Sequence, residues 1–209
     1  VKDYCIDLKG AKILDELTND ALKLQNLTVV LPNGSPLLSQ CTLTLPRRSH
    51  VLVTGASGAG KSTLLSALSG ALDAPQMTCT WQWPDGASGR QPKITTLEQK
   101  PVLFPHMSVL ANVAFPLRCV GIPTAEAEAR AREALESVGL EGLEQRRPAQ
   151  VSGGQAQRTA LARALVVAPE VLLLDEPMAA LDVEAARGLR ELIAQRFLGR
   201  TVIMVTHQI

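Results

Sequence analysis

The chain has 209 residues, of which 46% are apolar and 20% are charged. This composition is that of an ordinary globular domain, and it excludes a disordered tail and a fibrous protein. The 21 Lys and Arg nearly balance the 20 Asp and Glu, so the formal net charge is +1, and aromatic residues make up 3%. The charge balance argues against bulk electrostatic binding of nucleic acid, and the low aromatic content argues against a base-stacking platform.

The apolar stretches are short, and none approaches the roughly 20 residues that a membrane-spanning helix needs. No signal peptide pattern opens the chain, and it begins with Val1 rather than Met, so we expect an excised piece or a processed chain. The cysteines lie far apart and form no C-x-x-C pair, so we expect small buried hydrophobes in a reducing compartment rather than metal ligands. They are Cys5, Cys41, Cys79 and Cys119.

The first fifth of the chain predicts a linker followed by a small antiparallel sheet. Residues 1–20 mix charged and apolar side chains without a clear period, and we expect a linker or an upstream tail there. Residues 22–30 alternate apolar and polar, which indicates a half-buried strand, and a Pro-Asn-Gly turn follows at 32–34. A second strand is expected at 43–45.

Farther along, strands alternate with helices, which predicts a mostly parallel sheet. The expected strands are 51–54, 94–98, 171–174 and 201–206, and the expected helices are 61–71, 124–138 and 182–198. Pro123 and Gly139 are suited to start and stop the second of these helices, and Asp182 is suited to cap the third. Residues 73–92 are rich in Pro, Gly and polar residues, which favours a loop or an edge hairpin.

A glycine-rich loop lies between the expected strand 51–54 and the helix that follows it. Residues 55–62 match G-x-x-x-x-G-K-[ST] in full. Glycines let the backbone wrap closely around a phosphate, and the helix N-terminus adds its positive end. Lys61 supplies a charge to the β- and γ-phosphates, and Ser62 offers a hydroxyl to Mg²⁺. The alternative, a glycine-rich turn with a solvated lysine, does not account for strand, motif and helix together.

The apolar strand at 171–174 ends in two carboxylates, Asp175 and Glu176. A buried parallel strand delivers its last residues to the ligand edge of a sheet, where Asp175 can hold Mg²⁺. Glu176 is then placed to polarise an attacking water. A solvated acidic loop is the alternative, and Lys61 and Ser62 upstream disfavour it.

A second anion site is predicted at Ser152-Gly153-Gly154-Gln155, which opens an expected helix. Ser152 and Gln155 have the spacing of a capping box, and the two glycines leave backbone N–H groups uncovered. An ordinary capped helix is the alternative.

With these motifs in order, residues 22–209 resemble the ATP-binding cassette (ABC) ATPase family. Its motifs match here as Walker A (Gly55, Ala56, Ser57, Gly58, Ala59, Gly60, Lys61, Ser62, Thr63), Gln99, the signature 151–155, Walker B 171–176, the D-loop 179–182 and His207. The resemblance implies an α/β P-loop NTPase (RecA-like) fold with a mostly parallel sheet, a small N-terminal antiparallel β subdomain and an α-helical subdomain at about 105–155. The ATPase domain would span 21–209 and lack the family's terminal strands and helices.

The resemblance also implies ATP and Mg²⁺ as ligands and a head-to-tail dimer with a second ABC ATPase domain, identical or not. Each ATP would lie between the Walker A of one subunit and Ser152–Gln155 of the other. Catalysis would involve Glu176, His207 and Gln99, and Mg²⁺ would contact Ser62, Asp175 and Gln99. Leu31 stands where the family usually has an aromatic residue that stacks on adenine, so we expect weak contact with the base, missing about 1–3 kcal/mol of stacking.

The implied activity is ATP hydrolysis that powers a membrane transporter with transmembrane permease subunits, at the cytoplasmic face of the inner or plasma membrane and without nucleic acid. Residues 103–117 resemble bacterial importer ATPases, which favours import. Residues 22–30 and 43–53 resemble the corresponding regions of exporters with fused membrane domains, so an exporter domain stays an alternative. A soluble ABC ATPase is a further alternative, and the absence of a coiled coil between Lys61 and Ser152 argues against the chromosome and repair members of that class. A regulatory module without turnover is another alternative, and intact Glu176 and His207 argue against it.

Overall fold

The computed structural model describes residues 3–7, 21–30, 34, 36–46, 48–55, 58–71, 78–82, 92–179 and 181–206. The chain divides into two compact units. The first, which we call the sheet unit, comprises Val1–Thr96, Glu170–Asp175 and Gly199–Ile209. The second, the helical unit, comprises Leu97–Pro169 and Glu176–Leu198.

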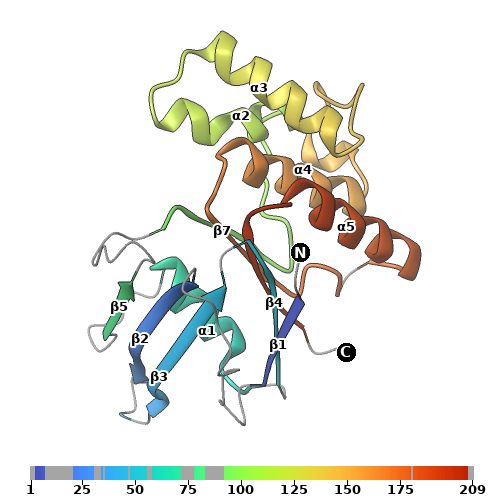
Figure 1. Ribbon diagram of the computed structural model, residues 1–209. Helices are drawn as coiled ribbons and strands as arrows, with labels where there is room; N and C mark the ends of the chain where they lie inside the picture. The colour runs from blue at the N-terminus through green and yellow to red at the C-terminus, as the bar shows by residue number, and fades with distance from the viewer. Residues whose placement is uncertain are drawn as a thin grey trace. The chain divides into compact units, whose positions relative to one another are not determined.

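The sheet unit contains a five-stranded sheet (Figure 1). Its strands, in spatial order, are β1 (Asp3–Asp7), β4 (His50–Thr54), β8 (Thr201–Val205), β7 (Val171–Asp175) and β6 (Ile94–Leu97), of which only the last residue belongs to the helical unit. The pairs β4–β8 and β7–β8 are parallel, as the alternation of strands and helices predicted, and β1–β4 is parallel as well. The first four side chains of β7 are buried, which explains why this strand is apolar without a break.

A separate three-stranded sheet has the order β3 (Pro36–Pro46), β2 (Ala21–Val30), β5 (Thr78–Gln82), and both of its pairings are antiparallel. This confirms the small antiparallel sheet expected near the N-terminus, although β3 is longer than predicted. β5 falls in the stretch 73–92, where we expected a loop or an edge hairpin, and most of the remaining stretch lies outside the described residues.

Helix α1 (Lys61–Ser69) follows β4 and packs against β7. Its inner face is made of Leu64, Leu65 and Leu68, which are buried. Gly60 and Gly70 flank it in the left-handed conformation, which glycine adopts without steric cost. The helix therefore starts where the glycine-rich loop ends, as predicted.

The helical unit contains α2 (Val109–Cys119), α3 (Thr124–Ser137), α4 (Gly153–Val166) and α5 (Val183–Arg196), with a 3₁₀ turn at Pro148–Gln150. Helices α2, α3 and α4 pack against one another, and α5 packs against α4 (Figure 1). Their contacts bury leucines such as Leu135, Leu161 and Leu189. Helices α3 and α5 end within one or two residues of their predicted bounds, which is the usual uncertainty of helix ends.

Three local features differ from the sequence-based expectations. Asp3–Asp7, inside the expected linker, form β1 and pair with β4. Helix α2 was not predicted, and it contains Pro116, a residue that usually interrupts helices. The expectation of buried cysteines is wrong for Cys119, which is exposed as a free thiol at the end of α2.

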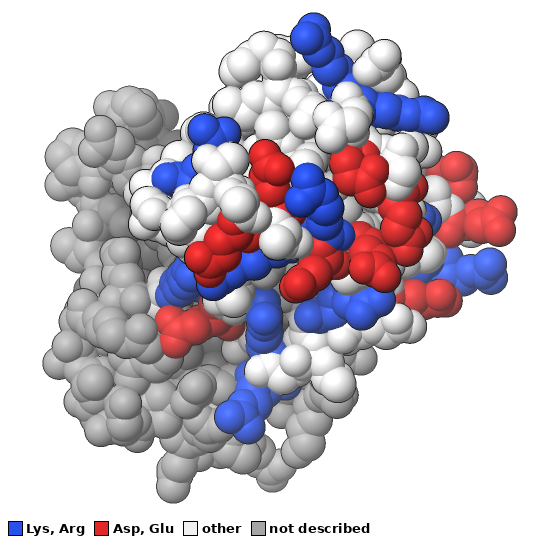
Figure 2. Space-filling model, turned by 90° about the horizontal axis from the view of Figure 1, so that it is seen from above, with Lys and Arg blue, Asp and Glu red and all other residues white. Residues whose placement is uncertain are grey.

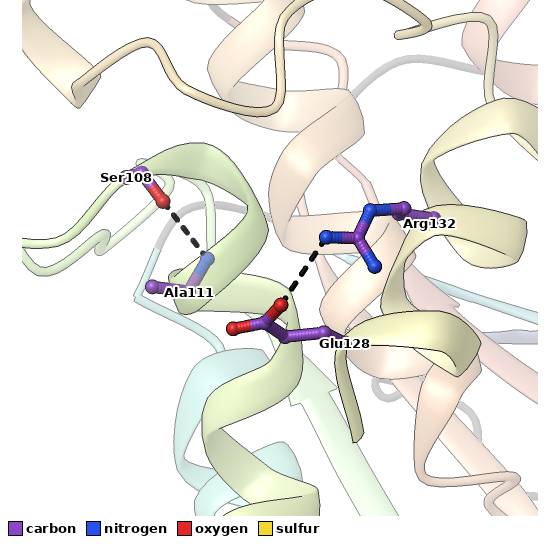
Figure 3. A network of polar contacts seen from close by, with 4 residues as sticks. All are labelled: Ser108, Ala111, Glu128 and Arg132. Carbon is purple, nitrogen blue, oxygen red and sulfur yellow. Dashed lines mark hydrogen bonds and ion pairs between the residues drawn. The ribbon is translucent and has the colours of Figure 1, made fainter. Parts of the chain in front are cut away.

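Charged side chains of both signs are interspersed over the described part of the face seen in Figure 2. On α3, Glu126 pairs with Arg130 and Glu128 with Arg132 across one helical turn, the second pair at 3.2 Å (Figure 3). Exposed pairs of this kind contribute about 0.3–0.5 kcal/mol each. The described part of the molecule has no helix long and apolar enough to cross a membrane.

Candidate functional site

The glycine-rich loop leaves β4 at Gly55 and enters α1 at Lys61. Gly58 has φ 77° and Gly60 has φ 89°, both in the left-handed region. A Cβ added to Gly58 would meet no atom within 4 Å, so this glycine is required for its backbone conformation rather than for space. Ala56 and Ser57 lie outside the described residues.

Lys61 is the first residue of α1, and only 4% of it is exposed. Its Nζ donates a 2.8 Å hydrogen bond to the Gly55 carbonyl, so the ammonium folds back over the loop. The first turn of α1 has no acidic residue to offset the positive end of the helix. Ser62, the next residue, is exposed, and Thr63 is half-buried. A buried cation, a helix N-terminus and an open hydroxyl together make a site for an anion and its counter-ion.

Asp175 lies at the same sheet edge as the loop. Val53 of β4 and Asp175 of β7 both pair with Val205 of β8, and all three strands run parallel. The Thr206 N–H continues this row by donating to the Val53 carbonyl at 3.2 Å. The sheet unit therefore brings together Gly55 and the half-buried Asp175, two of the residues that the sequence singled out.

Glu176 follows Asp175 directly and is half-buried. Its φ is 44°, a left-handed conformation that costs a non-glycine residue about 1–3 kcal/mol and is typical of functional sites. The Glu176 carbonyl accepts a 3.0 Å bond from the Ala179 N–H, which closes a tight turn after the strand. The backbone thus changes direction abruptly at the second carboxylate.

The predicted capping box is present at the start of α4. The Ser152 hydroxyl accepts from the Gln155 N–H at 3.2 Å, and Gln155 Oε1 accepts from the Ser152 N–H at 2.9 Å. The N–H groups of Gly153 and Gly154 have no hydrogen bond to the part of the chain that the structure describes. Neither glycine would meet an atom within 4 Å of an added Cβ, so no side chain covers the position where their Cβ atoms would lie.

These residues line a hollow of about 470 Å³ within the helical unit. Its other walls come from Arg158 of α4 and from the start of α5, namely Leu181, Asp182, Ala185 and Leu189. Asp182 caps α5 by accepting from the Ala185 N–H at 2.8 Å, which places an acid at that helix start. The start of α4 has no acid, so its N-terminus is the end that can receive an anion.

Gln99 is exposed and follows β6, the strand beside β7 in the sheet. Leu31 and His207 lie outside the described residues, so their roles stay predictions. No group of three or more His, Cys, Asp and Glu in the described ranges could hold a metal ion by itself. The oxygen donors at the sheet edge, Ser62 and Asp175, suit a Mg²⁺ whose remaining ligands are water and phosphate.

Two buried or half-buried polar residues were missed by sequence reasoning. Asn112 in α2 is fully buried, and Arg163 in the last turn of α4 is half-buried. The sequence held one signal for Asn112, a polar amide inside an otherwise apolar stretch. Arg163 had none, because arginines are common on helix surfaces.

Comparison with protein families matches residues 38–179 to the ABC transporter model. The spermidine/putrescine import ATP-binding protein PotA of Vibrio vulnificus is 41% identical over 84% of this chain and 48% of its own length. The Fe(3+) ions import ATP-binding protein FbpC of Escherichia coli is 40% identical over 89% of this chain and 54% of its own. The chain thus spans about half the length of these curated relatives.

The taurine import ATP-binding protein TauB of Pseudomonas entomophila is 39% identical over 90% of this chain and 73% of its own length. Among solved structures, cbiO1 from Clostridium perfringens, part of the ABC transporter complex cbiONQ, superposes with a TM-score of 0.77. It is 29% identical in sequence and covers 90% of this chain and 78% of its own.

Proposed function

Because the chain belongs to the ABC transporter family, we propose that it binds and hydrolyses ATP as the subunit or domain that powers a membrane transporter. The observation that carries this proposal is the sheet edge of the sheet unit. There a buried lysine, a left-handed glycine loop and the start of α1 lie at the same edge as Asp175. A phosphate chain and a divalent cation need this set of groups.

Lys61 and the loop amides would hold the β- and γ-phosphates. The Nζ that now donates to the Gly55 carbonyl is close enough to the loop to turn to a phosphate oxygen. Ser62 and Asp175 would hold Mg²⁺, with Gln99 as a further ligand from the segment after β6. The cation would neutralise charge on the phosphates during transfer.

Glu176 would act as the general base that orients and polarises the attacking water, and His207 would contact the γ-phosphate. The position of Glu176 at the end of a buried strand supports this role, as does its left-handed backbone. As the water oxygen bonds to the γ-phosphorus and the bond from that phosphorus to the β–γ bridging oxygen breaks to release ADP, the proton of the water would pass to the Glu176 carboxylate.

The second anion site requires a second ABC ATPase domain. Ser152–Gln155 present two open amides and a hydroxyl to the hollow beside α4. We propose that they contact the phosphates bound by the loop of a partner domain, in a head-to-tail dimer in which each domain completes the other's site.

The partners proposed beyond the dimer are transmembrane permease subunits, with this protein peripheral at the cytoplasmic face of the inner or plasma membrane. The names of PotA, FbpC and TauB all specify import, which favours an importer over the exporter alternative. We propose that this part of the protein does not choose the cargo, because relatives of similar identity are named for different substrates.

Measurement of phosphate release tests the proposed activity. The complete protein that contains this chain should release phosphate from Mg-ATP, and Glu176→Gln should lower the rate by at least about 10²-fold, because a general base is lost while size is kept. Glu184→Gln, an exposed glutamate in the first turn of α5, is the matched control and should keep the wild-type rate. Undiminished turnover in Glu176→Gln would remove this residue from the mechanism.

A further inference from the structure

We propose that Arg163 is a positioning residue that ties the segment following Gln99 to the helix that begins with Ser152–Gln155. The inference rests on the proposed ATPase function, in which both ends of this link contact nucleotide or its metal. All the residues concerned belong to the helical unit. The link would make Gln99 and the signature amides change position together.

One end of the link is the backbone at Val102. Arg163 Nη2 donates a 2.7 Å hydrogen bond to the Val102 carbonyl, three residues after Gln99. The guanidinium carbon also lies 6.0 Å from the centre of the Phe104 ring, within the range of a cation–π contact. Phe104 in turn packs on Phe115 of α2, with ring centres 4.7 Å apart. One side chain thus holds two points of the segment.

The other end of the link is the helix itself. Arg163 lies in the last turn of α4, whose first turn carries Gly153, Gly154 and Gln155. An uninterrupted helix transmits displacement along its axis, because every turn is hydrogen-bonded to the next. A shift of the first turn toward a phosphate would therefore move Arg163 and, through it, Val102.

The charge environment favours arginine over lysine at this position. Burial lowers the pKa of Arg163, and the neighbouring carboxylate of Glu98 opposes that change by favouring the charged form. Glu98 immediately precedes Gln99, so this attraction acts on the same segment. A planar guanidinium can donate to a carbonyl and stack on a ring at once, whereas an ammonium cannot.

Hydrogen bonds from α2 also hold the segment 102–108, so that the segment does not simply deform when Arg163 moves. Asn112 of α2 accepts from the Phe104 N–H at 2.7 Å and donates to the carbonyls of Phe104, Met107 and Ser108 at 3.1, 3.3 and 3.0 Å. Ser108 also caps α2 by accepting from the Ala111 N–H at 3.2 Å (Figure 3). The stretch from Val102 to Ser108 is therefore fixed to both α2 and α4.

A double-mutant cycle in the complete protein tests the link. Arg163→Met should lower kcat by about tenfold or more, as misplacement of a catalytic group does, without weakening ATP binding by the loop of the sheet unit. In a Gln99→Ala background the same change should cause no further loss, because Gln99 is then no longer there to be positioned. Arg132→Met, at an exposed ion pair of α3, is the control and should keep the wild-type kcat.

Two results would overturn the link. One is an equal loss of kcat in both backgrounds, which is what general destabilisation produces. The other is unchanged hydrogen exchange at residues 102–104 in Arg163→Met, which needs no turnover for its measurement. Arg163→Lys, which keeps a hydrogen-bond donor, should show a smaller loss of kcat with the same dependence on Gln99. This variant replaces Arg163→Met in the cycle if the Met variant does not fold. A wild-type protein without turnover would instead contradict the proposed function, while hydrogen exchange still decides the link.

Discussion

Lys61 combines two properties that rarely occur together, burial and a positive charge. It is 4% exposed, yet its Nζ bonds to the Gly55 carbonyl of the loop. A buried ammonium is costly unless hydrogen bonds or an opposite charge compensate it. In the proposed function, phosphate would add an opposite charge to the contacts that the Lys61 side chain already makes.

We predict that Lys61→Ala removes most ATP binding. A hydrogen bond to a charged group contributes about 1.5–3 kcal/mol, which corresponds to roughly 10–100-fold in affinity. Lys93→Ala is a suitable control, because Lys93 is exposed in the same unit and bonds to Glu170 and Val171 through its backbone N–H and carbonyl, which alanine keeps. Titration with a fluorescent ATP analogue measures both variants. Affinity of Lys61→Ala within a few-fold of wild type would show that this loop does not hold the phosphates.

Helix α2 shows what residue patterns do not predict at the scale of an element. Pro116 lies in the second half of this helix, which begins at Val109, and its first turn is secured by Ser108 and Asn112. The buried side chains of Val113 and Leu117 then decide the outcome through tertiary packing. The predicted helices, by contrast, carried their own start and stop residues, such as Asp182 and Gly139.

The sheet repeats this distinction. Strands β4, β7 and β8 were predictable because central parallel strands are apolar without a break. β1 was not predictable, because it mixes charged and apolar residues and lies at the edge of the sheet. Its partner β4 is some 45 residues away in the sequence, as the pairing of Cys5 with Leu52 shows. In the site, motif spacing predicted the loop, Asp175 and the capping box, whereas Arg163 and Asn112 depend on contacts between elements.

We predict that Asn112→Ala destabilises the helical unit by about 2–4 kcal/mol, since it leaves several backbone groups without partners and opens a cavity. Asn112 makes four hydrogen bonds to the segment 104–108 and is 0% exposed. Gln145→Ala, at an exposed position of the same unit, should change stability by less than about 0.5 kcal/mol. Urea denaturation followed by circular dichroism compares them. Equal midpoints for the two variants would contradict the anchoring role.

At the scale of the whole molecule, backbone suited to phosphate occurs in both units. The sheet unit has the loop that ends at Lys61, and the helical unit has the open amides of Gly153 and Gly154. The proposed head-to-tail dimer would use both, because a two-fold rotation would place each signature on the partner's nucleotide and complete two sites. Nucleotide would then form part of the interface, and hydrolysis would weaken that interface by removing the γ-phosphate contacts.

We therefore predict that Glu176→Gln accumulates as a dimer when ATP and Mg²⁺ are present, since nucleotide still binds but is not consumed. Adding Gly154→Asp should abolish this dimer by placing a carboxylate against the partner's phosphates. The aspartate has room, because no atom lies within 4 Å of its Cβ, and an acid in the first turn of α4 favours the helix. Loss of the dimer with unchanged thermal stability would thus locate the effect at the interface. Light scattering measures the dimer in both variants. A dimer that persists in the double variant would show that Ser152–Gln155 do not contact the partner's nucleotide.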